Sequence, residues 1–242
     1  MRGRGYFNYN GKASSAYGIE IEAYPDSTAA ERIFEKITVP GRNGDLIRDT
    51  GAYRNVMRSY PVYIHAAPST LPTAVHAIAG WLLGGSGYRR LEDNYDPDVF
   101  RMAAYRGPVE MSSFFDTHGR GRIEFDCKPQ KYLKYGEQPI TLSSAGVLHN
   151  PGMESLPLIT VYGSGTGAGT LVIGDVTVQI TYIPASGYMV IDCETQNAYR
   201  GTVNHNRDIS APVFPTLPSG DTAISWSGDI TGVKIVPRWW VL

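Results

Sequence analysis

The chain has 242 residues, a length typical of one large or two modest domains, and 42% of them are apolar, which excludes wholesale disorder. Its 22 Lys and Arg nearly balance its 23 Asp and Glu, for a formal net charge of −1. This balance excludes a protein that wraps nucleic acid or adheres to anionic lipid through a broad basic surface. No stretch approaches the roughly 18 apolar residues of a membrane-spanning helix, so no membrane contact is expected.

The composition favours many short strands over a helical bundle. There are 27 glycines, 16 prolines and 16 tyrosines, a mixture typical of strands joined by tight turns. The two cysteines, Cys127 and Cys193, are too few for a disulfide framework and too far apart for a zinc motif. We therefore expect a protein that folds in a reducing cytosol.

The charged residues divide the chain into two halves. Residues 1–138 contain 18 Lys and Arg and 16 Asp and Glu, whereas residues 139–242 contain only 4 and 7. Residues 128–139 lie between them and include two prolines, which suits an extended connector. The sequence thus predicts two domains, 1–138 and 139–242.

In the first half, one segment has helical periodicity. Ser69 and Thr70 offer capping side chains, Pro72 suits the first turn, and Gly84 is suited to end the helix. The apolar face of this helix comprises Val75, Ile78, Ala79 and Leu82. Alternating or branched residues at 60–64, 99–105 and 121–127 predict strands, and residues 93–97 are typical of a turn.

Residues 40–55 are predicted to form a long loop, because they include Gly41, Asn43-Gly44 and Gly51. Loops of this length inside a domain usually serve function or assembly. Its arginines are offset by Asp45 and Asp49 and do not alternate with aromatic residues, which disfavours a nucleic-acid site. A subunit interface is the better interpretation, because Arg and Tyr are enriched there. The candidate interface residues are Arg42, Arg48, Tyr53 and Arg54.

The second half is predicted to be almost entirely β. Expected strands cover residues 156–162, 170–173, 176–180, 188–192, 196–203, 222–226 and 233–236. Gly174-Asp175 fits a two-residue type II′ turn between the second and third of these. Strands at this spacing, separated by turn residues, indicate a β-sandwich.

No catalytic, metal or cofactor site is predicted. The glycine run 163–169 precedes a strand rather than a helix, which disfavours a phosphate-binding loop. The acidic residues at 92, 93, 96 and 98 lack the calcium-loop spacing and are ordinary turn chemistry. No zincin pair, nucleophile elbow or Cys–His arrangement is present, so the chain is not expected to be an enzyme.

Large apolar residues end the chain, from Trp239 to Leu242. They could form a last core strand, an exposed docking patch or an aromatic platform for a sugar. Trp226 and Trp239 are the candidates for a docking or glycan surface.

Taken together, these residues resemble the distal tail protein (Dit) family of long-tailed, siphovirus-type bacteriophages. The resemblance is carried by the order and spacing of stretches spread over nearly the full length. They include 14–19, 39–46, 51–55, 81–83, 91–103 and 125–129 in the first half, and 150–159, 190–193 and 214–220 in the second.

The resemblance implies an N-terminal tail-tube-like β-sandwich or barrel domain with one helix, followed by a galectin-like or carbohydrate-module-like β-sandwich. It also implies a structural baseplate hub at the virion tail tip, made in the host bacterial cytoplasm. The first domains would form a homo-hexameric ring between the tail tube protein and the tail-associated baseplate protein, with the tape measure protein as a further candidate partner. Genome DNA would pass through the lumen without specific binding.

Two other functions remain open. The first is a carbohydrate-binding module that aids host attachment, since the second half resembles a sugar-binding sandwich. The second is a cell-wall hydrolase, which the missing catalytic arrangements disfavour. Because the chain lacks the long insertions with which other family members hold receptor-binding proteins, the resemblance does not imply direct host recognition.

Overall fold

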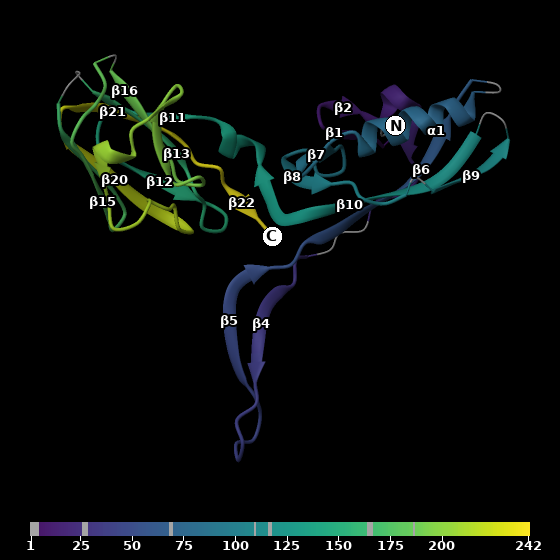
Figure 1. The fold of residues 1–242 in the computed structure, drawn as a ribbon, viewed down its shortest axis with the longest axis horizontal. Helices are drawn as coiled ribbons and strands as arrows, with labels where there is room; N and C mark the ends of the chain where they lie inside the picture. Colours follow the sequence, from purple (N-terminus) through teal and green to yellow (C-terminus); the bar gives the residue numbers. More distant parts are fainter. Residues whose placement is uncertain are drawn as a thin grey trace. The chain divides into compact units, whose positions relative to one another are not determined.

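A computed structural model describes residues 5–25, 29–67, 70–108, 110–115, 118–163, 167–185 and 187–242. The chain forms two compact units: the first comprises Met1–Lys131 with Leu242, and the second Tyr132–Val241. Most elements are strands, and α1 (Leu71–Leu83) is the one α-helix of the described chain (Figure 1). The predicted mainly β fold is confirmed. Within the described ranges, no helix is both long and apolar enough to cross a membrane.

The first unit is built on one large antiparallel sheet. Its longest ladder joins β10 (His118–Leu133) to β6 (Val56–His65), in register from His118 opposite His65 to Cys127 opposite Val56. The spatial order is β2 (Lys12–Ala13), β1 (Phe7–Tyr9), β7 (Arg89–Asp93), β8 (Val99–Ala104), β10, β6 and β3 (Ile19–Ile21), and β9 (Glu110–Phe115) also pairs with β10. A 3-10 helix, η1 (Ser14–Tyr17), precedes β3. The expected strands at 60–64 and 121–127 lie within β6 and β10, and the one at 99–105 covers β8 and one residue beyond it.

Helix α1 packs its apolar side into the core of this unit. Ile78 and Leu82 are fully buried, as the periodicity predicts, and so is most of Trp81. The Trp81 ring stacks on Phe7 at 5.8 Å between centroids, and its Nε1 donates to the carbonyl of Tyr9 at 3.2 Å. This packing, rather than local helix propensity, stabilises the helix.

The ends of α1 differ from the predicted caps. The Thr70 hydroxyl donates to the carbonyl of Ala67 at 2.7 Å and makes no capping bond to the helix. Gly84 keeps a right-handed conformation, with φ −70°, instead of the left-handed one of a C′ glycine. Ser69, the other expected cap, lies outside the described residues.

The prediction of a long loop at 40–55 is wrong. β4 (Arg32–Ile37) and β5 (Leu46–Tyr53) pair as a separate two-stranded sheet, and only the residues between them form a turn. Gly41 and Gly44 take φ of +80° and +79° in that turn, which glycine adopts without strain. The glycines therefore mark the tip of a hairpin rather than an irregular loop.

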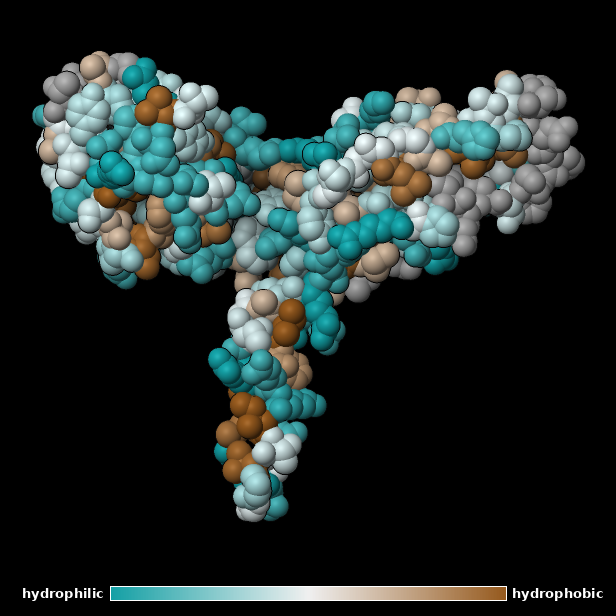
Figure 2. All heavy atoms as spheres, viewed as in Figure 1, coloured by the Kyte–Doolittle hydropathy of each residue, from teal (hydrophilic) through white to brown (hydrophobic). Residues whose placement is uncertain are grey.

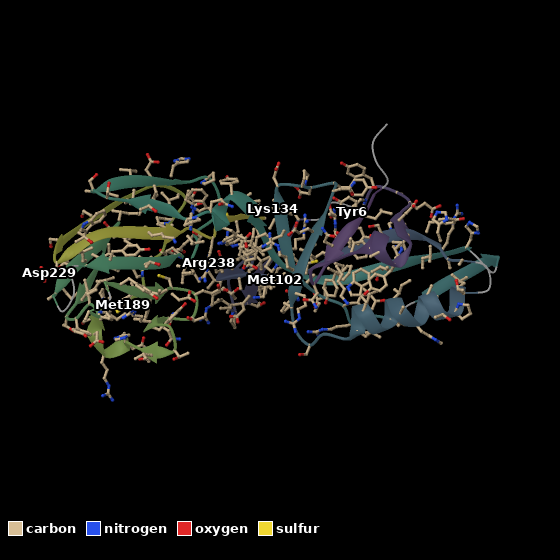
Figure 3. All side chains as sticks on the ribbon, turned by 90° about the horizontal axis from the view of Figure 1, so that it is seen from above. Tyr6, Met102, Lys134, Met189, Asp229 and Arg238 are labelled. Carbon is tan, nitrogen blue, oxygen red and sulfur yellow. The ribbon has the colours of Figure 1, made fainter. Side chains whose placement is uncertain are left out.

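The second unit is a β-sandwich of two antiparallel sheets, which confirms that prediction. One sheet has the order β11 (Ile140–Leu142), β21 (Ile230–Val236), β13 (Leu158–Gly163), β16 (Tyr188–Asp192), β17 (Asn197–Arg200) and β18 (Val203–Asn204). The other has the order β12 (Gly146–Asn150), β20 (Gly220–Gly228), β14 (Gly169–Ile173), β15 (Val176–Ile180) and β19 (Ile209–Ser210). The shorter elements are η2 (Lys134–Glu137), η3 (Asn206–Asp208) and β22 (Trp240–Val241). Buried residues of both sheets, such as Met189 on β16 (Figure 3), form the core between them.

Two turns test the sequence interpretation of this unit. Gly174 has φ +55° while Asp175 has no positive φ, as a type II′ turn requires, so that prediction is confirmed. The single strand expected at 196–203 is instead two strands, β17 and β18, because Gly201 at φ +57° opens a tight turn between Arg200 and Val203.

Both cysteines are free and buried, Cys127 at 0% and Cys193 at 1% exposure. Burial raises the pKa of each thiol to about 12, so little thiolate is present at neutral or mildly alkaline pH. We expect a thiol reagent such as Ellman's reagent to label neither residue in the native protein and both after unfolding in guanidinium. Rapid labelling of either thiol in the native protein would contradict this burial.

Candidate functional site

The β4–β5 hairpin, here called the arm (Arg32–Tyr53), is exposed along nearly its whole length. In its ladder Ile37 lies opposite Leu46, Glu35 opposite Arg48, and Phe34 opposite Asp49. Directly opposed residues in an antiparallel pair share a face. Each face of the arm therefore mixes apolar and charged side chains, and nearly every residue is exposed.

Large apolar side chains on the arm are open to solvent. The exposed fractions are 45% for Phe34, 44% for Ile37, 39% for Leu46 and 70% for Ile47. Figure 2 shows these brown side chains interleaved with teal ones along the arm. An isolated two-stranded hairpin is at best marginally stable in water, and grouped exposed apolar side chains are typical of interaction surfaces.

The charged residues of the arm mostly pair with one another. Arg32 Nε donates to Asp49 at 3.0 Å, and Arg48 lies 3.6 Å from Glu35. Exposed ion pairs of this kind contribute between about 0 and 1 kcal/mol each. They therefore add little to the stability of the arm.

The four predicted interface residues all lie on or beside the arm. Arg48 and Tyr53 belong to β5, Arg54 follows it and pairs with Glu31 at 3.5 Å, and Arg42 lies in the turn. Among the described residues, none pairs with the Arg42 guanidinium. Arg42 is thus at the opposite end of the arm from Tyr53 and Arg54, so the four do not form one cluster.

Sequence reasoning missed the residues that contribute most of the arm's apolar surface. Their signal is the alternation of Ile33, Glu35 and Ile37 before a glycine-containing turn. It continues after the turn with Leu46 opposite Ile37 and Arg48 opposite Glu35. A half-buried strand has apolar residues at every second position. Here charged residues occupy some of those positions, so the sequence pattern does not predict a strand.

A second surface is the face of the large sheet opposite α1. It includes Tyr63 on β6 and Arg120, Arg122 and Glu124 on β10, which are half-buried or exposed. Arg120 pairs with Glu22 at 2.7 Å, and Arg122 lies 3.8 Å from Glu124. Among the side chains that the structure describes on this face, these arginines are paired with carboxylates.

Of the two tryptophans predicted to form a docking or glycan surface, Trp239 is almost fully buried, and Trp226 stays a prediction. Trp239 is only 8% exposed, and its backbone and Cβ pack so closely on Gly136 that a Cβ there would lie 2.7 Å from the Trp239 amide nitrogen. Trp226 is half-buried and packs against the core of the sandwich. A sugar platform needs a ring face open to solvent, so Trp239 is corrected to a packing residue.

Arg238, beside Trp239, forms an ionic contact within the second unit (Figure 3). Its guanidinium lies 2.6 Å from Asp192 and 3.3 Å from Glu194. Burial alone would raise the pKa of Asp192, but the hydrogen bond and charge of Arg238 outweigh burial and lower it. Asp192 is therefore ionised and paired.

Of the acidic residues at 92–98, Asp93 has a clear structural role. Asp93 Oδ1 accepts the amides of Tyr95 and Asp96, each at 3.0 Å, which confirms the turn interpretation. Its other oxygen accepts from Tyr60 at 2.7 Å and Arg58 at 2.8 Å inside the core. No group of three metal-ligating side chains occurs in the part of the chain that the structure describes. The glycine run 163–169 is followed by a strand, β14, as predicted; its residues 164–166 lie outside the described residues.

These observations define the class of fold: an antiparallel sheet with one helix packed on it and a long exposed arm, followed by a two-sheet β-sandwich. A solved structure with the same arrangement is that of phage SPP1 Dit (gp 19.1), described as a paradigm of hub adsorption apparatus in Gram-positive infecting phages. The two are 15% identical, with a TM-score of 0.73 over 96% of this chain and 98% of that one. The chain therefore has a Dit-like fold.

Two further similar structures are chains of the phage P2 baseplate in its activated conformation. The one with Ca has a TM-score of 0.55 at 9% identity, and the one with Sr has 0.52 at 10%. Each match covers 96% of this chain. No protein-family profile and no curated protein sequence matches the chain. The fold, rather than sequence identity, thus links it to phage hub and baseplate proteins.

Proposed function

We propose that the protein is a structural hub of a phage tail tip, part of the apparatus by which the virion adsorbs to its host. The observation that carries the proposal is the match to SPP1 Dit over both units and nearly the full length of both chains. A stand-alone sugar-binding module would not need the first unit, and a hydrolase would need catalytic groups that the sequence does not provide.

In the proposed hub, the first units assemble into a closed homo-hexameric ring through the arm. The ring is heterologous, so the surface that the arm covers on its neighbour differs from the arm itself. The exposed pair Ile37 and Leu46 becomes buried in this contact, and Arg42, Arg48, Tyr53 and Arg54 contribute at its edges. Burial in the neighbour supplies the stability that a solvent-exposed hairpin lacks.

The remaining partners follow from a ring at the tail tip. It would join the tail tube protein to the tail-associated baseplate protein, with the tape measure protein inside the tube. The paired charges on the sheet face opposite α1 suit the wall of a channel through which DNA slides, because they leave few unpaired cations for phosphates. The protein would carry out this role in the virion without a cofactor or catalytic activity.

Native mass spectrometry of the purified chain tests the ring. We expect a species at six times the 26.5 kDa chain mass, or twice that for two stacked rings. The double variant Ile37→Glu with Leu46→Glu should shift it to the single-chain mass, because two buried carboxylates would face the neighbour. The matched control replaces Val147 and Val213, which are 61% and 60% exposed outside the arm, by Glu. A wild-type chain that stays monomeric at high concentration, or a ring that survives the arm variant, would count against the proposal.

The arginines are tested separately. The double variant Arg42→Ala with Arg54→Ala removes one cation near each end of the arm and leaves its apolar residues in place. We expect ring formation to weaken and to become less sensitive to salt, since interfacial charges are screened. If the ring forms unchanged, Arg42 and Arg54 do not contribute to the interface. That result would not contradict the proposed apolar contact of the arm.

A further inference from the structure

The chain contains two Asn-Gly pairs, Asn10-Gly11 and Asn43-Gly44. This dipeptide is reactive by itself, because the backbone nitrogen of the glycine can attack the side-chain carbonyl carbon of the asparagine. Glycine allows the close approach, since it has no Cβ and its backbone rotates freely. In a folded protein, the rate of this attack depends on how firmly the structure holds the two residues. The two pairs of this chain differ in that respect.

Asn10-Gly11 is held in a tight turn. It joins β1 to β2, whose ladder places Tyr9 opposite Lys12, so the pair forms a two-residue hairpin turn. Asn10 and Gly11 have φ of +51° and +76°, the left-handed values that a type I′ turn requires. The backbone amide of Asn10 also donates to the carbonyl of Arg90 at 3.0 Å. The strand pairing and this hydrogen bond restrict the rotation that the attack needs.

Asn43-Gly44 lies in the turn of the arm, and both residues are exposed. Thr38 Oγ1 donates to Asp45 at 2.9 Å and closes this turn outside the pair. Among the described residues, neither the Asn43 side-chain amide nor the Gly44 backbone N–H has a hydrogen-bond partner. Asn43 also lacks the positive φ that fixes Asn10 in its turn. No contact of the described chain therefore holds either reacting group in place.

We propose that Asn43 is a site of spontaneous deamidation. The Gly44 nitrogen forms a bond to Cγ of Asn43, and the side-chain nitrogen leaves as ammonia together with the proton that the Gly44 nitrogen gives up. The product of this step is a cyclic succinimide. Water then adds to one of its two carbonyl groups and opens the ring, which yields aspartate or isoaspartate. Water is the only co-reactant, and no bond is oxidised or reduced.

The modification changes the charge of the arm. The arm has four cationic and three anionic side chains, and the new carboxylate brings its net charge from +1 to zero. This carboxylate is next in sequence to Arg42, and charge-changing modifications act through the same pairing rules as other charges. The inference goes beyond the hub proposal and does not depend on ring formation, because both reacting groups belong to one chain.

Peptide mapping of the full-length protein after incubation at mildly alkaline pH tests the site. Trypsin, used at mildly acidic pH to prevent further reaction, releases the two pairs in separate peptides, residues 5–12 and 43–48. We expect aspartate and isoaspartate to accumulate several-fold faster at Asn43 than at Asn10. In guanidinium the two pairs should react at similar rates, because the hairpin turn that protects Asn10 is lost.

Two variants identify the reacting residue by ion-exchange chromatography, in which the deamidated chain separates as a more acidic species. Asn43→Gln should abolish this species, because the longer side chain forms the corresponding ring far less readily. The matched control Asn10→Gly removes the other amide at a φ that glycine adopts freely, so the acidic species should form as in the wild type.

The arm variant Ile37→Glu with Leu46→Glu is incubated in parallel, because a neighbour that covers the turn would slow the reaction in a ring. Faster modification of Asn43 than of Asn10 in either protein supports the proposal. The proposal is overturned if Asn43 reacts no faster than Asn10 in both proteins, or if Asn43→Gln still forms the acidic species. The oligomeric state is measured separately, so either of these results would leave the hub proposal intact.

Discussion

Replacing Asp93 by Ala is expected to unfold the first unit or to bring it close to unfolding. The Asp93 side chain is fully buried and lies 2.8 Å from the guanidinium of Arg58, whose side chain is 8% exposed. Removing the carboxylate leaves a buried cation unpaired and also removes the acceptor of the Tyr60 hydroxyl. Breaking a buried pair in this way costs about 3–5 kcal/mol, a large part of the roughly 5–15 kcal/mol that stabilises a domain.

The matched control is Asp98→Ala, an exposed aspartate in the same turn region. We expect it to change the free energy of unfolding by less than about 0.5 kcal/mol, as is usual for surface substitutions. Hydrogen exchange of β6 and β10 in the two variants distinguishes the outcomes. Equal protection in both would show that the Arg58–Asp93 pair contributes nothing to stability.

Asp93 also makes the free energy of unfolding of the first unit depend on pH. Burial alone would raise the pKa of Asp93, but hydrogen bonds from Tyr60 and the charge of Arg58 outweigh it and hold the pKa below its ordinary value. A carboxyl whose pKa is lower in the folded state stabilises fully above its unfolded pKa of about 3.9. That contribution is lost as the pH falls through the folded-state pKa. Acid titration of the wild type should show this loss, and Asp93→Asn should lack it.

The elements predicted most accurately from the sequence are those in which one face is apolar and buried. Strand β16 has the predicted bounds, and the apolar face of α1 is correct at Ile78 and Leu82 because both lie on the core side of an amphipathic helix. The buried pair of Arg58 and Asp93 was not predictable. Its members are far apart in sequence, and each is of a residue type that is usually exposed.

The arm shows why the candidate interface was found only in part. Its arginines stand out as unusual in a loop, so sequence reasoning identified Arg42, Arg48 and Arg54. Its apolar residues were missed because both faces of an exposed hairpin mix apolar and charged residues, so neither has the period of a half-buried strand.

Replacing Gly228 by Ala is expected to be the most destabilising glycine substitution tested in the second unit. Gly228 ends β20 with φ +75°, and a Cβ on it would lie 2.5 Å from the carbonyl oxygen of Ala168 and 2.9 Å from the Cα of Gly169. The left-handed conformation alone costs Ala about 1–2 kcal/mol. The clash with the neighbouring strand is with backbone, which cannot rotate away, and adds roughly 1–3 kcal/mol.

The control Gly201→Ala separates these two costs. Gly201 has φ +57° in the turn between β17 and β18, but a Cβ there meets nothing within 4 Å. Its loss of stability should therefore be only the conformational cost of about 1–2 kcal/mol. Denaturant unfolding, followed by hydrogen exchange of β14 and β20, measures both variants. Equal losses of stability in the two variants would show that β14 can move away from an added Cβ at no cost in free energy. The close approach of Gly228 to β14 would then not constrain the sandwich.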